Sequence, residues 1–239
     1  ISLIDRIVKY LSKKKGKFLR PALAINIGKC LNNLNPKNYT VASLVEMIHL
    51  ATLIHDDIVD ESSLRRGWPT IGRIWKNKIS LLIGDYIFSK ALSGMIQLKN
   101  FEALEILSET ANRLSQGELL QMERAKNKNM DESLYFTMIS DKTASLFSAS
   151  CKLGAITVTE DQDKINALSD FGELLGQAFQ IKDDLFDILG SESELGKPSG
   201  YDLKKNMLTL PLIYILSNKG AVSKKAFKLK LKLLEKTGR

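Results

Sequence analysis

Apolar residues recur at spacings of three and four along most of the chain, and this periodicity limits the folds open to it. The pattern is clear in Leu44–Ala51 and again in Leu104–Leu114. Because an α-helix has about 3.6 residues per turn, this spacing gathers apolar side chains on one helix face. Period-two alternation, which indicates β-strands, is scarce. We therefore predict an all-α fold, and a length of 239 residues favours a single domain over residues 1–239.

The net charge of +8 is concentrated at one end of the chain. Residues 217–239 hold eight basic side chains and one acidic side chain, a local charge of +7, which leaves +1 for everything before them. Nucleic-acid binding by the body of the protein is therefore disfavoured. We interpret residues 217–239 as a solvated basic tail. Its interspersed apolar residues suggest, as the alternative, peripheral contact with an anionic membrane surface.

The two cysteines, Cys30 and Cys151, match no metal-binding or disulfide spacing. Two thiols cannot form a disulfide framework, so a reducing compartment is the natural assignment. We predict that both thiols are buried or inert and that the protein is cytoplasmic.

Two short motifs carry aspartates at the same relative positions, each behind an apolar segment that is predicted to be helical. They are HDDIVD at residues 55–60 and KDDLFD at residues 182–187. Residues four apart on a helix lie on one face, with their Cβ atoms about 5–6 Å apart. Asp56 is therefore expected beside Asp60, and Asp183 beside Asp187.

These carboxylates favour a divalent cation. Like charges at this spacing destabilise a helix by about 0.2–0.5 kcal/mol per pair, a cost that a bound cation would remove. Oxygen ligands without thiolate or paired imidazole indicate magnesium rather than zinc. Magnesium usually takes one or two protein carboxylates and completes its shell with water and substrate phosphates. A solvated acidic face would explain one motif, but two copies with identical spacing favour a site for phosphate-bound magnesium.

Several basic residues fall where bound phosphates would require them. Arg65 and Arg66 follow the first motif, Lys17 and Arg20 lie within residues 16–21, and Lys197 lies in a predicted loop rich in Gly, Ser and Pro. Arginine and lysine are the usual phosphate ligands in proteins. Each of these residues, taken alone, would be interpreted as a surface residue.

Seven stretches extend this pattern over about residues 10–215. They are GKFLRP (16–21), EMIHLATLIHDDIVDESSLRRGWPT (46–70), GDYIFSKA (84–91), SQGELLQ (115–121), DKTASLF (141–147), FQIKDDLFD (179–187) and GKPSGYDL with LTLP (196–211). In order and spacing, the chain resembles the trans-isoprenyl diphosphate synthases, also called polyprenyl synthetases. The resemblance implies the isoprenoid synthase fold, a bundle of mostly antiparallel helices around a central hydrophobic cavity, and a homodimer. An apolar helix face such as Leu92–Leu107 could supply the two-fold interface.

The resemblance also implies roles for individual residues. Magnesium ligands, for three ions once substrate is bound, are implied at Asp56, Asp60, Asp183, Asp184 and Asp187. Contacts with the allylic diphosphate are implied at Arg65, Lys142, Thr143, Gln180 and Lys197. Contacts with isopentenyl diphosphate are implied at Lys17, Arg20, His49 and Arg66. Within these sets, Asp56, Asp60, Asp183, Lys142 and Lys197 are expected to be catalytic.

The implied reaction is magnesium-dependent prenyl transfer. The allylic diphosphate ionises, the double bond of isopentenyl diphosphate attacks the allylic cation, and a proton is lost to the released diphosphate. No protein general base is then required, which suits a chain with two histidines.

The helix that carries the first motif also indicates where a growing hydrocarbon would lie. Thr52 precedes Asp56 by one turn, Ala51 is its neighbour, and Ile48 lies one turn further. Short-chain members of the family have an aromatic floor near these positions, whereas Ala51 and Thr52 are small. The resemblance therefore implies a long-chain all-trans product, and replacing Ala51 by Phe or Tyr is expected to shorten it.

Three alternatives stay open at this point. A short-chain farnesyl or geranylgeranyl diphosphate synthase would differ in product length. A non-catalytic subunit of a heteromeric prenyltransferase would be expected to lose aspartates, which this chain keeps. An HD-type metal phosphohydrolase is suggested by the adjacent His55 and Asp56, but it needs further histidines and leaves the second motif unexplained.

Two positions depart from the family pattern. Phe18 stands where many members have a second basic residue, and Met207 stands where many have a lysine. Lys204 or Lys205 could supply the second charge. The chain also ends sooner after Pro211 than members of the family usually do.

Overall fold

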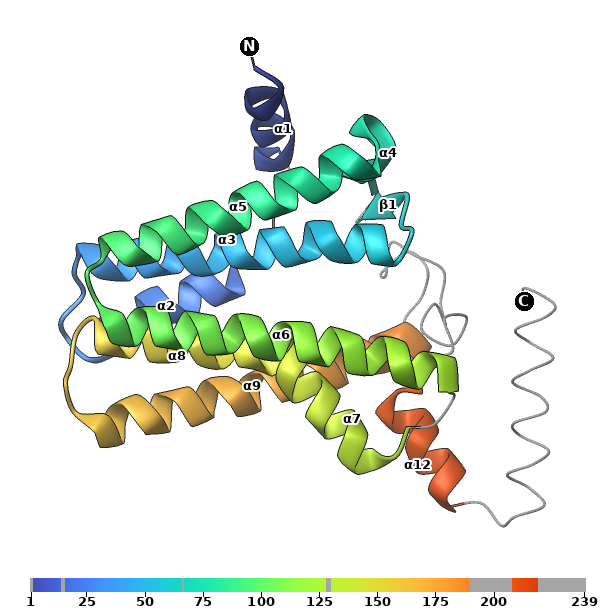
Figure 1. The fold of residues 1–239 in the computed structure, drawn as a ribbon. Helices are drawn as coiled ribbons and strands as arrows, with labels where there is room; N and C mark the ends of the chain where they lie inside the picture. Colours follow the sequence, from blue (N-terminus) through green and yellow to red (C-terminus); the bar gives the residue numbers. More distant parts are fainter. Residues whose placement is uncertain (1, 14–15, 66, 128–129, 190–207, 219–239) are drawn as a thin grey trace. The chain divides into compact units, whose positions relative to one another are not determined.

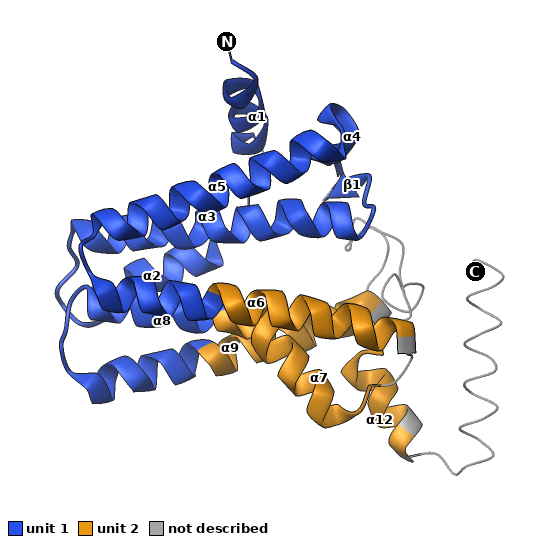
Figure 2. Cartoon of the chain, in the orientation of Figure 1, with its two compact units in different colours: residues 1–110, 146–172 blue, residues 111–145, 173–239 orange. Residues whose placement is uncertain are grey.

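The computed structural model describes residues 2–13, 16–65, 67–127, 130–189 and 208–218 (Figure 1). They form two compact units, residues 1–110 with 146–172 and residues 111–145 with 173–239 (Figure 2). The predictions for Arg66, Lys197 and Met207, and those for the tail beyond residue 218, lie outside the described residues. The assignment of one domain to residues 1–239 stays a prediction.

Nearly all described elements are helices, which confirms the all-α prediction. In chain order they are α1 (Leu3–Ser12), α2 (Leu19–Cys30), α3 (Pro36–Val59), β1 (Leu64–Arg65), β2 (Trp68–Pro69), α4 (Ile71–Trp75), α5 (Asn77–Gln97), α6 (Phe101–Asn127), α7 (Glu132–Ile139), the π-helix η1 (Ser140–Ala144), α8 (Ser145–Ile156), α9 (Gln162–Leu189) and α12 (Leu210–Asn218). The two short strands pair antiparallel around Gly67, whose φ of 77° suits a residue without Cβ.

The turn before α3 shows how local sequence sets a helix boundary. Asn35 caps the helix by accepting a hydrogen bond from the backbone N–H of Lys37, and Pro36 takes the first helical position. An Asn cap followed by Pro is a strong start signal, because the cap satisfies an N–H that has no helical partner and proline needs none. Asn38 completes a capping box by accepting from the backbone N–H of Asn35.

Asn38 also joins three helices of the first unit. Its fully buried side-chain amide donates to the carbonyl of Ala24 in α2 at 3.4 Å and to that of Gly154 in α8 at 3.0 Å. A Cβ at Gly154 would lie 2.7 Å from the carbonyl oxygen of Ala24, so the two helices approach too closely for any other residue there. The buried amide and the missing side chain together fix this contact.

In the same unit, α3 and α5 run side by side (Figure 1) and share an apolar core with α1 and α4. That core is formed by Ile7, Ala51, Ile54, Ile71, Ile83 and Ile87. The apolar periodicity that predicted a helix around Ala51 therefore corresponds to a buried face of α3.

The solvent-exposed side of α5 carries large apolar residues among polar ones. They include Leu82, Tyr86 and Ile96, and the exposed fractions of Leu82 and Ile96 are 62% and 61%. Among the described residues, α5 is the one helix whose length and hydropathy would allow it to cross a membrane, a test that core helices of soluble proteins also pass.

One sequence-based expectation about this region is wrong. We predicted that Leu92–Leu107 forms an apolar face of a helix, but α5 ends at Gln97 and α6 begins at Phe101. Lys99 has a φ of 52° in the turn, and the apolar pattern continues through the turn, so periodicity alone could not show the break. Phe101, at the start of α6, is 88% exposed.

The second unit is built on α7, α9 and α12. Tyr135 and Ile139 of α7 are buried together with Ile213 of α12, and Ile181 of α9 packs against them. After α7 the chain makes the π-helical turn η1 before α8 begins. Residues 111–127 of α6 also belong to this unit.

The two cysteines, predicted to be buried or inert, differ in exposure, and Cys151 alone is buried. Cys151 is fully buried beside Ile27, Ala155 and Ile165, whereas Cys30 is exposed. Burial raises the pKa of the Cys151 thiol to about 12. Because the thiolate is the reactive form, Cys151 should be inert at physiological pH.

This difference predicts the outcome of thiol labelling. At about pH 8, an excess of a chromogenic disulfide reagent should modify one thiol per folded chain and both thiols in denaturant. Cys30→Ser should abolish labelling of the folded protein and leave one thiol in the denatured protein. Rapid modification of folded Cys30→Ser would contradict the assigned burial of Cys151.

Candidate functional site

The first aspartate motif lies at the C-terminal end of α3. Asp56 and Asp57 are in the last turn of the helix, and Asp60 is its C-cap, with its backbone N–H donating to the carbonyl of Asp56 at 2.8 Å. Glu61 follows with a φ of 50°, which ends the helix. The last turn contains no basic residue. Since the C-terminal end of a helix carries partial negative charge, three carboxylates there raise the local energy until a cation approaches.

Arg65 neutralises one of these carboxylates. Its Nε donates to Oδ1 of Asp57 at 2.6 Å, and the Asp57 side chain is only 10% exposed. The hairpin of β1 and β2 returns Arg65 to the end of α3. Asp57 was not among the predicted site residues, and its contact with Arg65 shows that it holds an arginine predicted to bind substrate.

The predicted residues Arg20 and His49 meet within the first unit. Nη1 of Arg20 lies 3.2 Å from Nε2 of His49, and its guanidinium carbon lies 4.4 Å from the ring centroid of Phe147. Since arginine only donates, Nε2 of His49 is the acceptor in this contact. Phe147 is a further contact that was not predicted from the sequence. Lys17 is exposed just before α2.

Aspartates of the second motif lie at the C-terminal end of α9, in the second unit. As in α3, the last turn contains no basic residue. Asp183 is exposed, whereas Asp184 and Asp187 are 4% and 2% exposed. The expected pairing of Asp183 with Asp187 on one face therefore does not give the two carboxylates equal access to solvent.

Asp184 is held by neutral donors on both oxygens. The hydroxyl of Tyr135 donates to Oδ2 at 2.7 Å, and Nε2 of Gln180 donates to Oδ1 at 2.8 Å. Burial disfavours the charged form of this carboxylate and so raises the pKa of Asp184, and the negative charges of Asp183 and Asp187 raise it further. The two hydrogen bonds lower this pKa but do not outweigh burial.

Two predicted substrate contacts are linked to this carboxylate. The hydroxyl of Thr143 in η1 donates to Oε1 of Gln180 at 2.8 Å, and the same amide donates to Asp184. Gln180 can accept from Thr143 and donate to Asp184 at the same time, because a side-chain amide has a carbonyl acceptor and an NH₂ donor. Thr143, Gln180, Asp184 and Tyr135 thus form one continuous hydrogen-bonded chain.

A polar stripe on α9 could have indicated this arrangement. Its members recur at spacings of four and three and are Glu173, Gln177, Gln180, Asp184 and Asp187. Polar side chains at core spacing in a long helix mark a buried polar face. The last three of them were predicted site residues, whereas the pattern that joins all five was not among the predictions.

Lys142, the remaining predicted substrate contact in η1, forms an ion pair with Glu118 of α6. Both side chains are largely shielded from solvent. Glu118 lies in the SQGELLQ stretch but had no predicted role. The pair orients the lysine ammonium group until a competing anion replaces the carboxylate.

The three predicted chain-length residues differ in their surroundings. Ile48 and Ala51 are fully buried, and Ala51 lies in the packed core of the first unit. Thr52 keeps partial exposure, and its hydroxyl donates to the carbonyl of His49 at 3.0 Å. Of the three positions, Thr52 alone presents accessible surface.

No three His, Cys, Asp or Glu side chains gather as a metal-binding group among the residues that the structure describes. The first motif belongs to one compact unit and the second motif to the other. The assignment of magnesium ligands to these aspartates therefore stays a prediction.

Comparison with known proteins identifies the family. The model of the polyprenyl synthetase family matches residues 1–237. Octaprenyl diphosphate synthase of Escherichia coli is 36% identical over 216 residues, 90% of this chain and 67% of that protein. Heptaprenyl diphosphate synthase component 2 of Bacillus subtilis is 38% identical over 217 residues, 90% of this chain and 62% of that protein.

A solved structure shows the same fold. Polyprenyl synthase from Caulobacter crescentus CB15, in complex with calcium and isoprenyl diphosphate, is similar with a TM-score of 0.83 and 37% identity, and the match covers 88% of this chain and 64% of that one. The present chain thus spans about two thirds of the length of these relatives. The chain belongs to the polyprenyl synthetase family.

Proposed function

We propose that the protein is a magnesium-dependent trans-prenyltransferase that condenses isopentenyl diphosphate with an allylic diphosphate to make a long-chain polyprenyl diphosphate. The observation that carries this proposal is the placement of two aspartate motifs at the unfavourable C-terminal ends of α3 and α9. The names of the relatives, octaprenyl and heptaprenyl diphosphate synthases, support a long-chain product.

The aspartates suit magnesium, and the structural differences among them assign separate roles. Exposed Asp183 and half-buried Asp56 and Asp60 are the proposed ligands. Buried Asp184, with hydrogen bonds to both oxygens, instead positions the end of α9. Bound magnesium would supply positive charge that stabilises the departing diphosphate. The calcium in the related complex supports a divalent site in the family.

Two groups of residues would bind the substrates. Arg65, Lys142, Thr143 and Gln180 would bind the allylic diphosphate, together with Lys197 outside the described residues. Lys17, Arg20 and His49 would bind isopentenyl diphosphate, together with Arg66. The Arg20–His49 contact supports the second group, since it brings two of its members within 3.2 Å.

In the proposed reaction, the protein's positive side chains hold the departing diphosphate and its apolar walls exclude water. Ionisation breaks the carbon–oxygen bond of the allylic diphosphate. The double bond of isopentenyl diphosphate then forms the new carbon–carbon bond, and the proton passes to the released diphosphate. Fixed charges stabilise the leaving group because they need no reorganisation during the step.

The HD-type phosphohydrolase is not supported. Nε2 of His55 lies 3.2 Å from Oδ1 of Asp85, and His49 contacts Arg20, so both histidines of the chain have side-chain partners. The cytoplasmic location and the membrane contact of the tail stay predictions.

We expect exposed Asp183 to be needed for activity and dispensable for folding. Asp183→Asn should lower kcat/KM by about 100-fold, because the charge that would bind the cation is lost. The assay follows incorporation of radiolabelled isopentenyl diphosphate into farnesyl diphosphate with magnesium, and thermal unfolding is measured in parallel. Asp170→Asn, an exposed aspartate earlier on the same helix, should behave as wild type. Full activity of Asp183→Asn would refute its role, and an inactive wild-type chain would support a subunit of a heteromeric enzyme.

Thr52 is expected to set product length more cleanly than Ala51. Thr52→Phe should shorten the product with little change in stability, since the residue keeps accessible surface. Ala51→Phe should also shorten it, but overpacking of the core should cost about 1–3 kcal/mol of unfolding free energy. Products are sized by mass spectrometry and stability by urea unfolding. Unchanged product length in both variants would show that the hydrocarbon does not pass this helix.

The exposed apolar residues of α5 support our proposal of a homodimer. Burying them against a second copy would satisfy two-fold symmetry. Leu82→Glu should convert the dimer to a monomer in sedimentation analysis. Leu174→Glu, a control of similar exposure on α9, should leave the dimer intact. A wild-type monomer, or a dimer that tolerates Leu82→Glu, would contradict this interface.

A further inference from the structure

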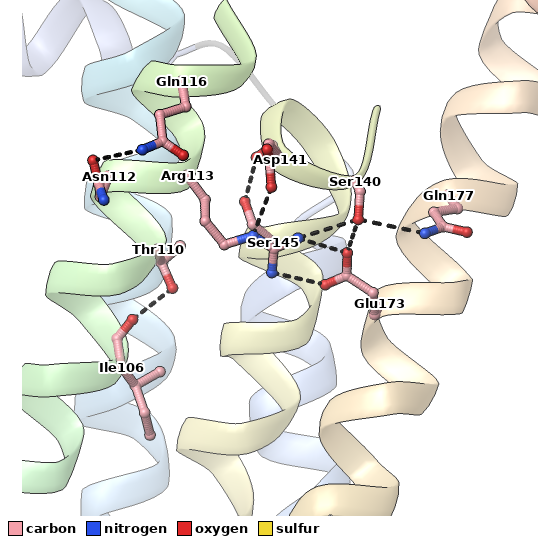
Figure 3. Close-up of polar contacts among 10 residues, drawn as sticks. All are labelled: Ile106, Thr110, Asn112, Arg113, Gln116, Ser140, Asp141, Ser145, Glu173 and Gln177. Atoms are coloured by element: carbon pink, nitrogen blue, oxygen red, sulfur yellow. Dashed lines mark hydrogen bonds and ion pairs between the residues drawn. The ribbon is translucent and has the colours of Figure 1, made fainter. Parts of the chain in front are cut away.

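Arg113 of α6 is the centre of a partly buried ionic network (Figure 3). Its Nε donates to Oδ1 of Asp141 at 2.8 Å. Its two terminal nitrogens bind both oxygens of Glu173, Nη1 to Oε2 at 3.1 Å and Nη2 to Oε1 at 2.7 Å. Nη2 also donates to the hydroxyl of Ser140 at 3.1 Å. One guanidinium thus uses all three of its nitrogens.

Arg113 stays charged under physiological conditions. Burial alone would lower the pKa of Arg113, but hydrogen bonds and charge interactions with Glu173 and Asp141 outweigh it and raise the pKa. The arginine and both carboxylates are each less than one third exposed. A bidentate arginine–carboxylate pair is directional as well as strong, so it fixes geometry in addition to balancing charge.

What this network holds is the π-helical turn η1. Ser140 and Asp141 are the first two residues of η1, and Lys142 and Thr143 follow them. The hydroxyl of Ser140 also donates to Glu173 and receives a hydrogen bond from the amide of Gln177 at 3.4 Å. The turn is therefore held by Arg113 from α6 and by Glu173 and Gln177 from α9 (Figure 3).

The backbone of η1 also packs tightly on α6. A Cβ at Gly117 would lie 2.4 Å from the backbone nitrogen of Lys142 and 2.9 Å from its Cα. Gly117 lies one helical turn after Arg113, so the same face of α6 supplies both the ionic anchor and the close contact. π-Helical turns are rare and occur often at functional sites.

We propose that Arg113 is a positioning residue that keeps η1 π-helical and thereby directs Lys142 and Thr143 toward the allylic diphosphate. This inference rests on the proposed function. Loss of the extra residue of the π-turn would change the helical register by one residue, a rotation of about 100°. Lys142 and Thr143 could then no longer serve their present partners, Glu118 of α6 and Gln180 of α9.

The first test keeps the positive charge at position 113 and removes the guanidinium group that binds both oxygens of Glu173. Arg113→Lys should weaken binding of a non-ionisable farnesyl thiodiphosphate, with magnesium, by about tenfold in calorimetry. The KM for farnesyl diphosphate should rise equally, while the KM for isopentenyl diphosphate stays unchanged. Arg124→Lys is the matched control, because this arginine of α6 has its ion-pair partner Glu123 next to it in the sequence, at 3.9 Å. Unchanged analogue binding in Arg113→Lys would overturn the proposal.

A second variant separates positioning from stability. Replacing a buried ionic pair by apolar residues of similar volume often preserves stability. In Arg113→Met/Glu173→Met, thermal unfolding should therefore recover relative to Arg113→Met alone, while the weakened analogue binding persists. Recovery of binding together with stability would show that the network is only structural. If Arg113→Met/Glu173→Met does not recover stability, Arg113→Lys and its unfolding temperature decide the question.

The two proposals fail in different ways. Wild-type protein that neither binds the thiodiphosphate nor extends farnesyl diphosphate would refute the proposed function, and with it the role of η1 toward this substrate. Wild-type protein that does both, with Arg113→Lys binding the analogue equally well, would refute the positioning role alone.

Discussion

The interaction on which the site depends is the one between carboxylates and the ends of the helices that carry them. Both aspartate motifs come at the C-terminal ends of long helices, where the backbone carbonyls already concentrate negative charge. A basic side chain in the last turn would relieve this repulsion, and neither helix has one there. Arg65 relieves part of this repulsion at the end of α3 by donating a hydrogen bond to Asp57.

The two units keep their aspartates in place by different means. In the first unit, the helix cap at Asp60 and the hairpin that carries Arg65 define the end of α3. In the second unit, a hydrogen-bonded chain from Thr143 through Gln180 to Asp184 and Tyr135 ties η1 and α7 to α9. Both arrangements fix polar and charged groups by hydrogen bonds before substrate arrives, and electrostatic catalysis depends on such preorganisation.

Part of this site could be predicted from the sequence because helical periodicity is local. The spacing of apolar residues located α3, α6 and α9, and the repeated aspartates located the ends of α3 and α9. The contact of Arg20 with His49 joins residues 29 positions apart, and only the family resemblance suggested it. Periodicity did not predict the turn at residues 98–100, where the positive φ of Lys99 separates α5 from α6 although the apolar pattern continues.

The sequence alone determined the helical class, the aspartate motifs and the family, since each depends on residue type and short spacing. The tertiary structure decided which side chains are bound by others. It buried Asp184 while leaving Asp183 exposed, paired Lys142 with Glu118, and placed Arg113 among three partners from η1 and α9. These outcomes depend on contacts between segments distant in the chain, and burial changes the energy of a charge more than any local propensity does.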